Sequence, residues 1–116
     1  MTNKNSTRYF SNLQETTVAK KTNSYKQVNS GATNFSKFDV LNKEASLGIE
    51  CKTCMTNKNS FSIKKDWIIK NKKEAFDMRL SNTAIAFNFG PNEPNYYIID
   101  ERLMTFLIEK LKEENN

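Results

Sequence analysis

Histidine is absent from the 116-residue sequence. Ser-His-Asp triads, histidine general bases and histidine-ligated metal sites are therefore excluded. Any catalysis has to use carboxylates, lysine, a thiol or a bound metal. The sequence also lacks an apolar run long enough to span a membrane, and no apolar segment follows its charged N-terminus. We therefore expect a protein without a secretory signal that works in the cytoplasm.

Cysteine is scarce as well: only Cys51 and Cys54 are present, in the run Cys-Lys-Thr-Cys. Such a pair can form half of a zinc site or a redox couple. Zinc requires about four ligands, so a zinc site would have to be shared across a dimer. We favour a simpler interpretation, in which Cys51 faces a core from a strand and Cys54 follows where the strand ends. Cytosolic thiols of this kind stay reduced.

Charge is unevenly distributed along the chain. Residues 1–73 carry 14 Lys or Arg and 5 Asp or Glu, whereas residues 74–116 carry 4 and 8. The first part therefore has a net charge of +9 and the second −4, which gives the overall +5. A basic segment of this size favours a polyanionic partner, above all nucleic acid, although a solvated surface would show the same composition.

The length is typical of one domain, and we expect a single domain over residues 1–116 with frayed ends at 1–7 and 113–116. Periodicity predicts helices at 8–22, 64–80 and 101–113. Strands are predicted at 25–29, 36–41, 46–53, 83–89 and 96–99. This order indicates an α/β or α+β fold with a central mixed five-stranded sheet flanked by helices.

Three details of these elements can be tested against a structure. The first helix is expected to bury a stripe of Phe10, Leu13 and Thr17, with Val18 on its flank. Asp100 is expected to be the N-cap of the last helix. That helix has more apolar residues than one stripe needs, so it either forms a dimer interface or packs on its own sheet. These apolar residues are Leu103, Met104, Phe106, Leu107, Ile108 and Leu111.

Two neighbouring strands carry the residues that could bind a metal or take part in catalysis. Glu50 and Lys52 alternate with apolar residues in the strand at 46–53, so they share one face. If the strand before it pairs as a hairpin, Asp39 converges on the same face. Two carboxylates in one place repel each other unless a cation lies between them, and Mg²⁺ or Mn²⁺ suits such oxygen donors. Lys52 is then placed to reach a phosphate oxygen or an attacking water. The alternative is a solvated strand with an ordinary Glu–Lys pair.

These residues occur in an order that resembles a known family. The matching segments are Ser30-Gly31-Ala32, Phe38-Asp39-Val40 and Ile49-Glu50-Cys51-Lys52-Thr53, preceded by Glu15 on the first helix. The pattern resembles the archaeal and phage-type Holliday-junction resolvases, which have the PD-(D/E)xK, restriction-endonuclease-like nuclease fold. The resemblance spans about residues 8–108 and departs from the motif at Phe38, where proline is usual.

The resemblance implies a homodimeric, Mg²⁺-dependent endodeoxyribonuclease that cuts two strands of a four-way DNA junction, with Mn²⁺ as a substitute. Glu15, Asp39, Glu50 and the backbone carbonyl of Cys51 would hold the metal, and Lys52 would position water and stabilise the developing charge. Ser30 would contact phosphate or orient the site. The expected contacts to the DNA backbone are Lys37, Lys64 and Lys65. The resemblance implies no membrane and no small-molecule cofactor. If the chain is phage-encoded, it would work in the host cytoplasm.

Other functions remain open at this point. The same fold serves nucleases that cut flaps, single strands or unbranched duplex. A non-catalytic DNA-binding module or a structural protein of a phage particle would also use a basic surface. Trp67 is interpreted as a core residue rather than a base-stacking platform, because a lone aromatic residue on a helix usually packs inside.

Overall fold

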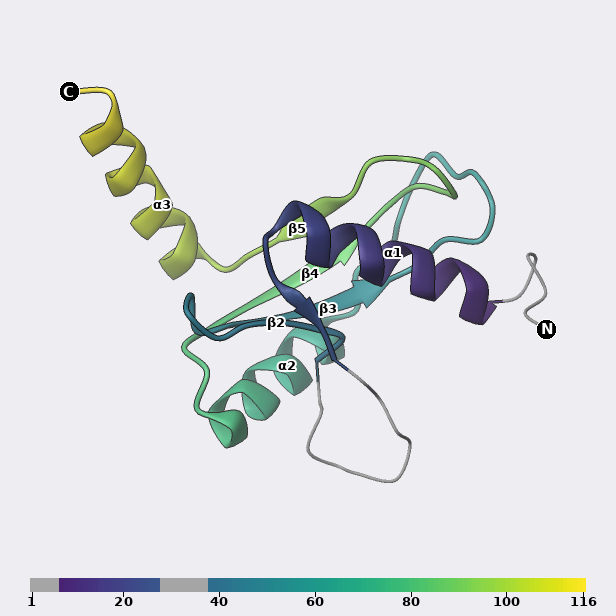
Figure 1. The fold of residues 1–116 in the computed structure, drawn as a ribbon, viewed down its shortest axis with the longest axis horizontal. Coiled ribbons are helices and arrows are strands. Elements are labelled where there is room, and N and C mark those ends of the chain that lie inside the picture. Colours follow the sequence, from purple (N-terminus) through teal and green to yellow (C-terminus); the bar gives the residue numbers. More distant parts are fainter. Residues whose placement is uncertain (1–6, 28–37) are drawn as a thin grey trace.

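The computed structural model describes residues 7–27 and 38–116 (Figure 1). The elements, in chain order, are α1 (Thr7–Lys21), β1 (Tyr25–Lys26), β2 (Val40–Asn42), β3 (Leu47–Lys52), α2 (Lys65–Met78), β4 (Asn82–Phe87), β5 (Tyr96–Ile98) and α3 (Glu101–Glu114). The predicted order of elements is confirmed, and the fold is α+β.

The five strands form one mixed sheet in the order β1-β2-β3-β4-β5. Neighbouring strands are antiparallel except for β3 and β4, which run parallel over six residue pairs from Leu47–Asn82 to Lys52–Phe87. A parallel pair requires a crossover connection, and α2 is part of it. The central position of β3 keeps the residues on it away from the sheet edges.

The two faces of the sheet are covered by different helices. On one face, Val18 and Ala19 of α1 pack in a cluster with Val40, Ile49, Ala84 and Ala86. On the other face, Ala75 of α2 packs with Phe38 and Leu41. Figure 1 shows α1 and α2 beside the sheet, while α3 points away from it. None of the helices in the described ranges is long and apolar enough to cross a membrane.

The structure corrects several details of the predicted elements. Leu13, expected on the buried stripe of α1, is 45% exposed, and Thr17 is exposed as well; the buried residues of α1 are Gln14, Val18 and Ala19. The stripe was misjudged because a polar residue, Gln14, is buried one turn before Val18 in place of Leu13. Strand β2 begins at Val40, so Asp39 lies just before it, and α3 continues to Glu114. Thr7, expected to be frayed, begins α1.

The predicted N-cap of the last helix is confirmed. The Asp100 carboxylate accepts a hydrogen bond of 2.9 Å from the backbone N–H of Leu103. The first turn of α3 therefore has one of its free N–H groups satisfied by a side chain, as helix starts require.

Candidate active site on β3

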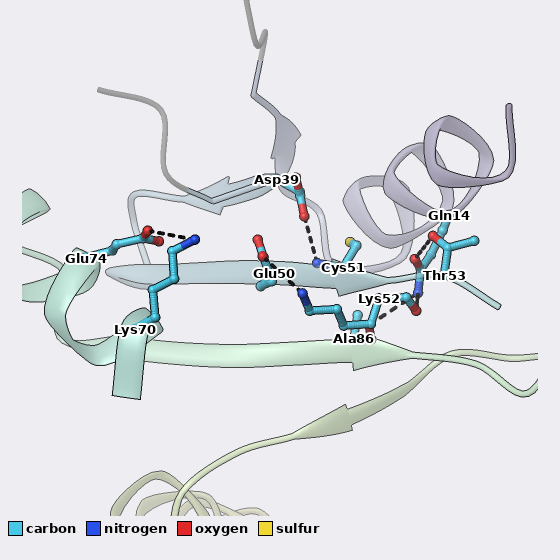
Figure 2. Close-up of polar contacts among 9 residues, drawn as sticks. All are labelled: Gln14, Asp39, Glu50, Cys51, Lys52, Thr53, Lys70, Glu74 and Ala86. Carbon is cyan, nitrogen blue, oxygen red and sulfur yellow. Dashed lines mark hydrogen bonds and ion pairs between the residues drawn. The ribbon is translucent and has the colours of Figure 1, made fainter. Parts of the chain in front are cut away.

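Asp39 is fixed by two hydrogen bonds to β3 and by one to Gln27, the residue after β1. Its backbone N–H donates to the Ile49 carbonyl at 3.1 Å, and its carbonyl accepts from the Gln27 N–H at 2.9 Å. Its carboxylate Oδ2 accepts from the backbone N–H of Cys51 at 2.8 Å (Figure 2). The carboxylate is thus bonded to the strand that carries Glu50, which is the convergence that the sequence predicts.

The residue before Asp39 is a phenylalanine that packs against β3. Phe38 is 2% exposed and packs in the cluster with Leu41 and Ala75. Its ring lies over Gly48 of β3, where an added Cβ would come within 2.5 Å of the ring. A large buried ring seated on a glycine fixes the backbone immediately before Asp39, because close-packed interiors leave such a ring few alternatives.

Glu50 and Lys52 share one face of β3, as predicted. The Lys52 Nζ lies 3.7 Å from the Glu50 carboxylate and 4.3 Å from the centre of the Trp67 ring. The Lys52 ammonium is therefore held between an anion and an aromatic face, both of which attract it. Trp67 was expected in the core, but it is only half-buried, next to Phe61, and belongs to neither buried cluster; its ring lies beside the Lys52 ammonium instead.

Glu50 has the most perturbed carboxyl of this group. The pKa of Glu50 is raised to about 8, first by burial and then by the charge of Asp39 and a side-chain hydrogen bond with it. Lys52 opposes this rise, and Glu74 of α2 contributes to it. A carboxyl that resists ionisation because it is buried and faces other acids is a typical feature of functional sites, where a cation or substrate later supplies the missing positive charge.

Glu15 belongs to the same electrostatic cluster. Burial raises the pKa of Glu15, Asp39 raises it further, and Lys26 lowers it. Glu15 follows Gln14 in α1 and lies at the border of the buried face formed by Gln14, Val18 and Ala19. The helix thus brings Glu15 toward the Asp39 end of the site, as the sequence pattern predicts, although Glu15 and Asp39 are joined by no direct bond.

Cys51 and Cys54 are both free thiols. Cys51 packs against the α1-side core, and Cys54 is buried. Burial raises the pKa of the Cys51 thiol far above its usual range, and the nearby charges of Asp39, Glu15 and Glu50 add to this effect. The thiol therefore stays protonated and is a poor nucleophile and metal ligand. Only the backbone of Cys51 takes part in the site.

The donor chemistry suits a hard divalent cation. The charge of Asp39, just before β2, raises the pKa of both Glu15 on α1 and Glu50 on β3, and a cation between these carboxylates would relieve the repulsion. Within residues 7–27 and 38–116, no three His, Cys, Asp or Glu side chains are already arranged as a metal ligand set. The oxygen donors fit Mg²⁺ or Mn²⁺ in kind.

Gln14 is a further residue of the site that the sequence pattern did not predict, and it is 4% exposed. Its Nε2 donates to the carbonyls of Lys52 at 3.0 Å and Ala86 at 3.3 Å, and its Oε1 accepts from the Thr53 hydroxyl at 2.6 Å (Figure 2). It also donates to Asn95 at 3.0 Å. This amide joins α1 to the ends of β3 and β4, so it sets where Glu15 and Lys52 lie. No pattern in the sequence distinguishes it from a solvated helical glutamine.

The predicted DNA contacts are only partly described. Lys64 is the N-cap residue of α2 and Lys65 its first residue; both side chains are exposed. The Lys64 Nζ lies 5.9 Å from the Trp67 ring, on the side of the site that carries Lys52. Ser30 and Lys37 lie outside the described residues.

Comparisons with known proteins identify no relative of this chain. No protein-family model matches the chain, and neither a curated protein nor a solved structure shows significant similarity to it. The resemblance to PD-(D/E)xK nucleases therefore rests on the motif residues and their arrangement on β2 and β3. Membership of that family stays a prediction.

Proposed function

We propose that this protein is a metal-dependent endonuclease that hydrolyses DNA phosphodiesters at branched structures, with the four-way junction as its preferred substrate. One observation carries the proposal. Asp39 is hydrogen-bonded to the strand on which Glu50, with a pKa raised to about 8, lies 3.7 Å from the ammonium of Lys52. A solvated Glu–Lys pair has no need of burial or of a second and third acid facing it.

Each residue has a distinct part in this proposal. Glu15, Asp39 and Glu50 would hold the cation, with the Cys51 carbonyl as a further oxygen donor. When bound, Mg²⁺ offsets the phosphate charge and activates the phosphorus centre as a Lewis acid. Lys52 donates hydrogen bonds to a phosphate oxygen and stabilises the charge that develops there, in the orientation set by Glu50 and the Trp67 ring.

Binding to DNA follows from charge rather than from base contacts. Residues 1–73 carry a net charge of +9. Lys64 and Lys65 are exposed at the start of α2, and the Lys64 ammonium lies near the Trp67 ring that also contacts Lys52. Lysines on a duplex contact phosphates, which position a protein without reading sequence. Selection of a junction over linear duplex then depends on the shape of the DNA.

The test is cleavage of three labelled substrates of the same sequence: a four-way junction, a flap and a linear duplex, each with Mg²⁺ and with EDTA. We expect paired incisions in the junction, only with the metal present. Glu50→Gln and Lys52→Ala should abolish cleavage while binding persists. Glu44→Gln and Lys73→Ala are matched controls, because Glu44 is exposed in a turn and Lys73 is exposed on α2.

Each alternative has its own outcome in this experiment. Tight junction binding without cleavage in any divalent metal would replace the nuclease with a non-catalytic DNA-binding module. Preferential cutting of the flap would keep the reaction and change the substrate. If Glu50→Gln and Lys52→Ala both cut at the wild-type rate, the site on β3 is not catalytic.

A further inference from the structure

A row of side chains crosses the sheet on the face that carries the candidate active site. Strand pairing aligns Lys52 of β3 with Phe87 of β4, and Phe87 with Tyr96 of β5. Side chains of residues aligned in this way point to the same face of a sheet. Neighbouring strands lie about 4.8 Å apart, so Tyr96 is displaced from Lys52 by only about 10 Å across the sheet. Two aromatic rings therefore continue the row that begins at the Lys52 ammonium.

Three more aromatic rings join Phe87 and Tyr96. The ring centre of Phe61 lies 4.9 Å from that of Phe87 and 6.3 Å from that of Trp67. The ring centre of Phe89 lies 5.5 Å from that of Phe87 and 5.8 Å from that of Tyr96. We call these five residues the aromatic surface. None of them belongs to either buried cluster; Tyr96 is 49% exposed and the other four are half-buried. A contiguous group of large apolar side chains that remains in contact with water is a feature of interaction sites.

Two lysines flank the aromatic surface. The Lys64 Nζ lies 5.9 Å from the centre of the Trp67 ring. Lys58 is exposed, and its backbone N–H donates to the Phe89 carbonyl at 2.7 Å. Within residues 7–27 and 38–116, neither ammonium forms an ion pair. The surface thus offers flat apolar rings together with available positive charge.

These two properties identify the chemistry of the ligand. Nucleotides combine flat ring faces, which stack on aromatic side chains, with phosphates, which pair with lysines. A protein partner that covered the rings would also have to bury the ammonium groups of Lys58 and Lys64, which is costly unless it supplies matching acids. Bases inside a duplex are already stacked on one another, so their faces are available only where a strand has left the duplex.

We propose that the aromatic surface binds unpaired bases of a DNA strand, with Tyr96 as the most exposed stacking platform and with Lys58 and Lys64 on the intervening phosphates. Every base has a flat face, so stacking selects DNA by its structure rather than by its sequence. This binding goes beyond the proposed cleavage and does not require it. Where the proposed function also holds, the strand that is cut carries unpaired nucleotides beside the phosphate at Lys52. A fully paired four-way junction then has to open a base pair at its branch point.

A comparison of two labelled oligonucleotides on the full chain in EDTA tests the proposal. One is an oligothymidylate of about 12 nucleotides, and the other has the same length and phosphates but abasic sites in place of the bases. We expect the oligothymidylate to bind at least about fivefold more tightly in fluorescence anisotropy. Trp67 is the only tryptophan of the chain, so quenching of its fluorescence by the bases reports contact with the aromatic surface.

Two adjacent tyrosines provide a matched pair of variants. Tyr96 contacts Phe87 and Phe89, whereas Tyr97 is aligned with Ala86 and lies on the opposite face of the sheet. Tyr96→Ser should lower the affinity for the oligothymidylate at least about fivefold and leave that for the abasic strand unchanged. Tyr97→Ser should change neither. Tyr96→Phe keeps the ring and should bind like the wild type, which separates lost stacking from a disturbed fold.

Equal affinity of the wild type for the two oligonucleotides would overturn the proposal, and this comparison needs no variant. So would an unquenched Trp67 in the complex, or a loss of affinity in Tyr97→Ser as large as that in Tyr96→Ser. A protein that prefers the oligothymidylate but cuts no DNA refutes only the nuclease. One that cuts junctions and binds both oligonucleotides equally refutes only the base-binding surface.

Discussion

Replacing Glu50 by glutamine should stabilise the metal-free protein at high pH. The pKa of Glu50 is raised from 4.5 to about 8, so the folded state holds the proton more tightly than the unfolded chain does. The stability that protonated Glu50 contributes to the folded protein is therefore fully present below pH 4.5 and declines as the pH rises toward 8. At about 1.4 kcal/mol per tenfold change in proton affinity, ionising the carboxyl costs the folded protein up to about 5 kcal/mol.

The glutamine variant avoids that cost. Its amide is neutral at every pH and can donate to Asp39 as the protonated glutamic acid does. Because Asp39 and Lys52 adjust when Glu50 ionises, we expect a gain of about 2 to 4 kcal/mol at pH 9, and almost none at pH 5. The measurement is urea denaturation at pH 5, 7 and 9 in EDTA, followed by circular dichroism. Glu44→Gln, an exposed carboxylate in a turn, is the control and should show no comparable trend.

Addition of Mg²⁺ distinguishes a metal-binding site from a group of carboxylates that only destabilises the folded protein. The cation should restore stability to the wild type at pH 9, because it binds only the folded state, and should restore much less to Glu50→Gln. A variant less stable than the wild type at pH 9 in EDTA would refute the reasoning. So would a stability difference that is the same at all three pH values, since the cost would then not arise from ionisation.

Three further predictions address the surroundings of the site. Gly48→Ala should cost about 1–3 kcal/mol in urea denaturation, because the new methyl group meets the Phe38 ring, and an unchanged midpoint would show that the ring does not fix Asp39. Gln14→Glu should destabilise the protein by about 1–3 kcal/mol, more at high pH, because a buried carboxylate would face the carbonyls of Lys52 and Ala86. Junction affinity should fall steeply with salt, and Lys64→Ala should lower the slope of the log–log plot by about one; a slope that does not change would remove Lys64 from the interface.

Much of the fold was predictable because its periodicities are simple. Residues Leu47, Ile49 and Cys51 alternate with Glu50 and Lys52, and this pattern fixes both the strand and the faces that its side chains occupy. The placement of Asp39 opposite Glu50 followed from assuming a hairpin, which the antiparallel pairing of β2 and β3 confirms. These inferences are local, so one sequence was enough.

The features that the sequence did not predict depend on contacts between segments that are distant along the chain. Gln14 is buried because four groups from β3, β4 and the loop after it surround its amide, and they lie between 38 and 81 residues away in the sequence. Because these hydrogen bonds satisfy its amide, a glutamine can occupy a buried position where helical periodicity would predict an apolar residue such as leucine. The contact of Phe38 with Gly48 is similar, since neither residue alone indicates that the other lies against it.

The alternation of β3 gives its two faces different chemical characters. Glu50 and Lys52 lie on one face of the strand and form the candidate site. Leu47 and Ile49 lie on the other face, where they contribute to the α1-side core and to an apolar groove beside α3. One central strand thus separates a charged surface from an apolar one, which a helix with its continuous circumference could do only less sharply.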